Sequence, residues 1–95
     1  MLETLTLSHF EPHIGDVFTI TGSDSSLSLT LKSVKPLGTA LRDGGAFSLN
    51  FVGPEAPLLP QSIYTLRHAA FGTLDLFIVP IGKDKEGIVY EAIFT

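Results

Sequence analysis

The sequence contains no cysteine, and it offers neither a long apolar run nor a recognisable leader. Without cysteine, a disulfide or a thiolate metal site is impossible, and nothing points to an oxidising compartment. No apolar run approaches the roughly 20 residues that a membrane-spanning helix needs. The N-terminus lacks a basic segment followed by an apolar one, the pattern of a secretory signal. We therefore expect a cytoplasmic protein with no membrane segment.

Basic residues are also scarce. The chain has six Lys and Arg residues against ten Asp and Glu residues, which gives a formal net charge of −4 at pH 7. The basic residues are scattered along the chain, whereas a nucleic-acid surface gathers them into a stripe or patch. We therefore expect no nucleic-acid partner.

Apolar residues, in contrast, are abundant for the length of the chain. They make up 44% of the 95 residues, and charged residues only 17%. A chain of this size forms one domain, and this composition can bury a core rather than remain disordered. We predict a single β domain over residues 1–95.

Apolar and polar residues alternate with a period of two through most of the chain, which is typical of strands with one buried face. We predict six strands and a weaker seventh at the N-terminus; their ranges are 17–21, 26–34, 46–53, 62–68, 73–80, 88–94 and, for the weak one, 4–8. Short turns with glycine or charged residues separate them. The fold class is therefore all-β, a small antiparallel barrel or sandwich of six to seven strands.

Two local patterns add detail to this prediction. Ser8 and Glu11 fit a capping box, and Pro12 limits any helix that follows, so one short helical turn is expected near residues 9–13. The stretch Gln61–Pro80 reads as a hairpin that organises the fold. Its second strand becomes apolar on both faces around Phe77, which predicts a strand covered above and below that ends at Pro80.

The second half of the chain carries a recognisable pattern of residues. It consists of Phe47-Ser48-Leu49, Phe51, Gly53-Pro54, Leu59-Pro60-Gln61, Tyr64, Leu66, His68, Gly72, Leu76-Phe77, Val79-Pro80, Gly87, Tyr90-Glu91-Ala92 and Phe94. With the opening segment Leu5 to Gly15, this pattern resembles a family of small bacterial β domains of unknown function. The resemblance implies an accessory role in a bacterial or phage-tail-like assembly, and it assigns no functional residues.

Two groups of residues suggest catalytic or metal chemistry, and neither develops into a site. His9 and His13 have the spacing of two ligands on one helical face, but Pro12 interrupts the helix and no third ligand lies nearby in sequence. His68 and Asp75 would need a marked nucleophile to form a triad, and the chain has no Gly-x-Ser-x-Gly motif. We therefore predict no catalytic residue, no metal site and no cofactor.

Prolines recur every three residues at Pro54, Pro57 and Pro60, the period of polyproline II. The segment Pro57, Leu58, Leu59 and Pro60 is therefore a candidate partner-contact site, with the alternative that its leucines fold back to close one end of the barrel.

The function predicted from the sequence is a non-enzymatic protein-interaction or assembly module. Its partner is another protein or a second copy of the chain, with an open sheet edge at a terminal strand as one possible contact. The alternative is a small-ligand-binding β-barrel, with a cavity lined by four aromatic residues, namely Phe18, Phe47, Phe51 and Phe77. An enzyme would instead require His68 within hydrogen-bond reach of a carboxylate in a cleft.

Overall fold

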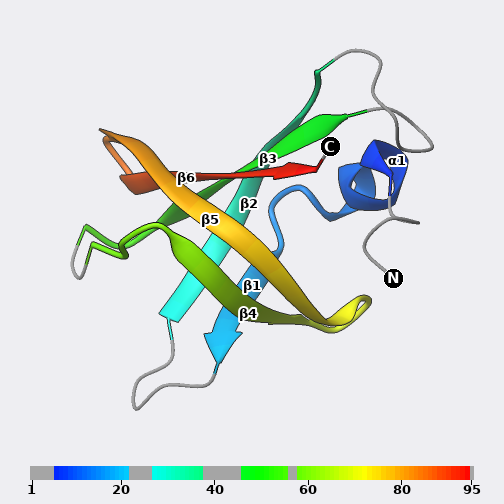
Figure 1. Cartoon of the computed structure of the whole chain (residues 1–95), viewed down its shortest axis with the longest axis horizontal. Helices are drawn as coiled ribbons and strands as arrows, with labels where there is room; N and C mark the ends of the chain where they lie inside the picture. The colour runs from blue at the N-terminus through cyan, green and yellow to red at the C-terminus, as the bar shows by residue number, and fades with distance from the viewer. Residues whose placement is uncertain (1–5, 22–26, 38–45, 56–57, 95) are drawn as a thin grey trace.

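The computed structural model describes residues 6–21, 27–37, 46–55 and 58–94. Six antiparallel strands form a closed barrel in the order β1-β2-β3-β6-β5-β4 (Figure 1). The elements are α1 (Leu7–Phe10), the 3₁₀ turn η2 (Glu11–His13), β1 (Val17–Thr21), β2 (Leu27–Pro36), β3 (Phe47–Gly53), β4 (Ser62–His68), β5 (Gly72–Asp84) and β6 (Gly87–Phe94). The all-β prediction, with six strands and one short helical turn, is confirmed.

The barrel closes because β1 pairs with β4 as well as with β2. Both ends of the sheet are thereby paired, and the prediction of an open edge at a terminal strand is wrong. Closure gives every described strand two paired neighbours and so leaves no edge strand to which another chain could add. A partner chain therefore has no edge strand to extend among the strands that the structure describes.

Alternate residues of each strand point inward and fill the barrel. Phe18, Leu29, Phe51, Leu66 and Tyr90 come from five different strands, and each is 0% exposed. Tyr90 and its even-numbered neighbours on β6 face the core as the alternation predicts, while Ile93 faces outward. The alternation of apolar and polar residues in the sequence thus indicates which side chains point into the barrel and which point outward.

The helical segment α1–η2 covers one end of the barrel, close to the C-terminal end of β6 (Figure 1). The ring of Phe10 is fully buried there, with its centroid 4.6 Å from that of Phe71, 5.5 Å from that of Phe94 and 5.9 Å from that of Phe47. Phe10 therefore acts as an apolar plug at this end.

The helix begins earlier than its predicted cap. Its N-cap is Thr6 rather than Ser8, and the Thr6 backbone N–H donates to Nδ1 of His9 at 2.9 Å, the role predicted for Glu11. Leu7 is helical, so the weak strand predicted at 4–8 is wrong over its described part. A threonine with a histidine three residues later makes the reciprocal cap in place of the serine–glutamate pair.

Strand β5 also differs from its prediction in two respects. Phe77 is 52% exposed, so the strand is covered on one face only, because a closed barrel has a single interior. Pro80 does not end the pairing: it lies opposite Tyr90, next to a register shift between Pro80 and Gly82, and the strand continues to Asp84. An irregularity of this kind accommodates a residue that has no N–H to donate.

Candidate functional site

Three polar side chains meet where the helical segment joins the barrel: His13 at the end of η2, Asp16 just before β1, and His68 at the end of β4. Nδ1 of His13 and Nε2 of His68 each lie 2.9 Å from the same carboxylate oxygen, Oδ2 of Asp16. The His68 ring is almost fully buried, while the side chains of His13 and Asp16 are 28% and 46% exposed. The carboxylate thus connects a buried imidazole to a partly exposed one.

The backbone around Asp16 is held in place by hydrogen bonds to β2. Gly15 donates its N–H to the carbonyl oxygen of Leu31 at 2.7 Å, and Leu31 donates in return to the carbonyl oxygen of Asp16 at 3.0 Å. Gly15 has φ of 98°, a value that glycine adopts without the steric penalty of a side chain. The Asp16 N–H donates to the carbonyl oxygen of His13 at 2.9 Å. The position of the carboxylate is therefore fixed from both sides.

A second hydrogen bond determines where His68 carries its proton. The Ala70 backbone N–H donates to Nδ1 of His68 at 3.0 Å, so Nδ1 is an acceptor in this arrangement. The neutral imidazole then has its hydrogen on Nε2 and donates it to Asp16. The pKa of Asp16 lies below its ordinary value of 3.8, mainly because the hydrogen bond from His68, and then that from His13, stabilises the charged carboxylate.

Aromatic rings enclose the imidazoles of this cluster. The His68 ring stacks on Phe18 with centroids 4.4 Å apart, and the His13 ring meets the edge of Phe71 at 5.2 Å. The two imidazoles lie 4.8 Å apart. Apolar surroundings strengthen the hydrogen bonds within the cluster by lowering the local dielectric.

The structure pairs the candidate residues differently from the sequence-based hypotheses. His9 bonds to Thr6 and His13 to Asp16, so the two-histidine spacing does not converge on a common point. Asp75 accepts a hydrogen bond from the Thr65 hydroxyl at 2.6 Å on the outside of the barrel, and the carboxylate partner of His68 is Asp16 instead. Sequence reasoning missed Asp16; its spacing of three from His13 was the available signal.

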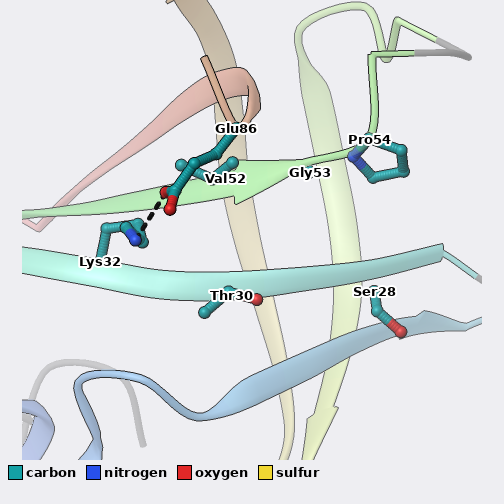
Figure 2. A pocket seen from close by; sticks show the side chains of 7 residues that line it. All are labelled: Ser28, Thr30, Lys32, Val52, Gly53, Pro54 and Glu86. Atoms are coloured by element: carbon teal, nitrogen blue, oxygen red, sulfur yellow. Dashed lines mark ion pairs between the residues drawn. The ribbon is translucent and has the colours of Figure 1, made fainter. Parts of the chain in front are cut away.

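A polar groove of about 370 Å³ lies on the outer surface along β2 and β3. Figure 2 shows Lys32 and Glu86 joined across it, with Nζ 2.6 Å from Oε1, and the hydroxyls of Ser28 and Thr30 following along β2. The hydrogen bond to Glu86, together with its negative charge, raises the pKa of Lys32 above the ordinary 10.5. The Lys32 ammonium and the Glu86 carboxylate therefore form an ion pair with each other.

The proline segment divides into an inner and an outer part. Leu59 packs against the core, and its backbone N–H donates to the buried Tyr90 hydroxyl at 3.0 Å. The Tyr64 hydroxyl donates to the carbonyl oxygen of Pro60 at 2.6 Å. Leu58 is 60% exposed, and Pro57 lies outside the described residues. Leu59 thus adopts the folded-back alternative, and the partner-contact role of the segment stays a prediction.

Three large apolar side chains form a row on the outer face of β4, β5 and β6. Ile63 is 67% exposed, Phe77 52% and Ile93 53%. Ile63 pairs directly with Phe77, and Ile93 lies on the neighbouring strand β6, two residues beyond Glu91, the partner of Val79. We call Ile63, Phe77 and Ile93 the apolar row.

The aromatic residues of the small-ligand alternative do not line one space. Phe18 and Phe51 contact each other in the core with centroids 5.4 Å apart, and the Phe47 ring stacks on Phe94 at 4.6 Å. Phe77 lies on the outside. These side chains fill the interior with their own packing.

Comparisons with known proteins add a family but no activity. Residues 5–94 match the model of the family described as "Domain of unknown function (DUF6916)". Neither the curated proteins nor the solved structures contain a significant match to the chain. In the part of the chain that the structure describes, no helix is long and apolar enough to cross a membrane.

Proposed function

The chain belongs to the family "Domain of unknown function (DUF6916)", which assigns no activity. We propose that it is a non-enzymatic module that works through contact with another protein surface. The apolar row carries this proposal. Every described strand of the closed barrel has two paired neighbours, and the exposed apolar face of β4–β6 is the surface that we propose for a partner. Contiguous exposed apolar side chains typically mark interaction sites, whereas single ones are ordinary.

The occupant that we propose for the apolar row is the same row of a second copy. Ile63, Phe77 and Ile93 cross three adjacent strands, which places the outer two backbones about 10 Å apart. In a two-fold symmetric dimer, the same surface of both copies forms the contact. Hydrophobic attraction has no directional requirement, so the apolar row of one copy can pack against the apolar row of the other. The apolar row ends at β6, because the next strand, β3, has the buried residue Ser48 opposite Ile93.

His68 lies within hydrogen-bond reach of a carboxylate, that of Asp16, which meets one of the conditions set above for an enzyme. The proposal of a non-enzymatic role rests on the other members of this cluster. Its hydrogen bonds join His13, Asp16, His68 and backbone groups, and among the described residues they include no serine, threonine or lysine that could serve as a nucleophile. The cytoplasmic location and a place in a bacterial or phage-tail-like assembly, both expected from the sequence, are parts of the same proposal.

Sedimentation velocity over a concentration series tests self-association. We expect the wild-type protein to shift from monomer to dimer with increasing concentration, and Phe77→Glu to remain monomeric because a buried unpaired charge opposes the contact. Val17→Glu is the matched control, since Val17 is equally exposed at 51% but lies on β1, away from the apolar row. A wild type that stays monomeric up to about 1 mM would contradict self-association.

A further inference from the structure

We propose that His13, Asp16 and His68 form a binding site for a divalent transition-metal ion of the Zn²⁺ type. This inference is independent of the proposed protein contact, because the three residues lie at the end of the barrel that α1–η2 covers, while the apolar row lies on the outside of β4–β6. The proposal differs from the sequence-based expectation of no metal site. That expectation tested His13 only as a partner of His9, and not with Asp16 and His68.

The three donor atoms already surround a common point. Nδ1 of His13, Oδ2 of Asp16 and Nε2 of His68 all lie within 4.8 Å of one another, and both nitrogens are 2.9 Å from the oxygen. Ligand atoms around one tetrahedral Zn²⁺ at 2.0–2.2 Å are separated by about 3.3 Å. An ion can therefore enter with small side-chain shifts.

The backbone holds these donors before any ion arrives. Asp16 is fixed by its hydrogen bonds with His13 and Leu31, and His68 by its place in the β4–β5 ladder opposite Gly72. The Phe18 ring restrains the plane of the His68 imidazole by stacking on it. Donors with restricted rotamers lose little entropy on binding, which favours a defined site over a transient one.

The donor set selects a class of ion. Two imidazole nitrogens and one carboxylate oxygen suit Zn²⁺ and its first-row neighbours, whereas Mg²⁺ prefers oxygen ligands alone. Asp16 and His13 are partly exposed, so a fourth position is open to solvent, as in sites that retain a bound water. The aromatic rings on the other side supply the apolar shell that surrounds many metal sites.

Binding requires a rearrangement of protons at His68. In the metal-free protein its hydrogen lies on Nε2, because Nδ1 accepts from the Ala70 N–H. An ion needs the Nε2 lone pair, so the hydrogen must move to Nδ1 and the Ala70 N–H must find another acceptor. Ala70 lies in an exposed turn, where water can take that role. His13 likewise must carry its hydrogen on Nε2 when its Nδ1 binds the ion.

This exchange of tautomers gives a specific test. Long-range ¹H–¹⁵N spectra of the histidine rings report which nitrogen carries the hydrogen. We expect Nε2–H at His68 with a chelator present, and Nδ1–H with a metal-bound Nε2 after one equivalent of Zn²⁺. The Ala70 amide resonance should shift in the same titration. The rings should not respond to Mg²⁺.

Variants distinguish the site from histidines that bind metal at the surface. Calorimetric titration with Zn²⁺ should show one site whose affinity falls more than about tenfold in His13→Ala and in Asp16→Asn. His9→Ala is the matched control, because His9 is exposed, lies in the same segment and bonds to Thr6 instead. Circular dichroism confirms that each variant is folded.

Two results would overturn the proposal. One is the absence of saturable binding up to about 1 mM Zn²⁺ with His68 retaining Nε2–H, which would establish a hydrogen-bonded cluster only. The other is an equal loss of affinity in His9→Ala and His13→Ala, which would assign the ion to the exposed helical segment.

Discussion

Nε2 of His68 lies 2.9 Å from Oδ2 of Asp16, although the two residues are 52 positions apart in the chain. This contact joins the end of β4 to the residue that precedes β1, two strands that also pair with each other. With His13 on the same oxygen, it attaches the segment that plugs the barrel to the barrel wall.

Asp16→Asn tests the contribution of this carboxylate to stability. With a chelator present, we expect the variant to have a lower free energy of unfolding than the wild type at pH 7. The folded-state pKa of Asp16 is lowered, so its contribution is fully present above the ordinary value of 3.8 and is lost as pH falls through the folded-state value. Urea unfolding at a series of pH values should show the two proteins converging in acid. A difference that does not change with pH would contradict the assignment.

Phe10→Ala tests the apolar plug. The ring is fully buried against Phe47, Phe71 and Phe94, so its removal should lower the free energy of unfolding by about 3–5 kcal/mol. Phe77→Ala, measured at a concentration low enough for the protein to be monomeric, is the control of matched chemistry on the exposed face, with an expected change within about 0.5 kcal/mol. Equal effects in chemical denaturation would show that the helical segment does not close the barrel.

Gly87→Ala tests a close approach of two strands. Gly87 has φ of 147°, and a Cβ at this position would collide with the carbonyl oxygen of Gly53. The strained φ alone is expected to lower stability by about 1–3 kcal/mol, and the collision adds to this. Gly82→Ala, for which a Cβ meets no atom within 4 Å, should be tolerated. Thermal unfolding of both variants makes the comparison.

Tyr90→Phe tests how the proline segment is attached. The Tyr90 hydroxyl accepts the Leu59 N–H, so its removal should destabilise the protein by about 1 kcal/mol and speed hydrogen exchange at the Leu59 amide. Tyr64→Phe removes a different bond, to the carbonyl oxygen of Pro60, and should leave the Leu59 amide protected. If the Leu59 amide exchanges as fast in the wild type as in Tyr90→Phe, the hydrogen bond to the Tyr90 hydroxyl does not hold the proline segment in place.

Most strands were predictable because they alternate between exposed and buried residues, although β3 is buried along almost its whole length. The alternation in β6, with Tyr90 inward and Ile93 outward, appears directly in the sequence. Closure was not predictable, because the pairing of β1 with β4 depends on contacts between distant strands. The same closure explains Phe77, whose neighbours suggested burial on both faces.

The cluster at His13, Asp16 and His68 was only partly visible in the sequence. His13 and His68 were both considered, but each with the wrong partner, since local spacing favoured His9 and strand position favoured Asp75. The correct partner depends on how η2 and β4 meet in space, and on the turn at Gly15 that directs Asp16 between them.

A dilution series followed by amide chemical shifts tests the central claim most directly, because it locates any contact on the surface. The account predicts concentration-dependent shifts concentrated at Ile63, Phe77 and Ile93, with β1 unaffected. Shifts that centre on Leu58 or on the polar groove at Lys32, or spectra that do not change with concentration, would contradict it.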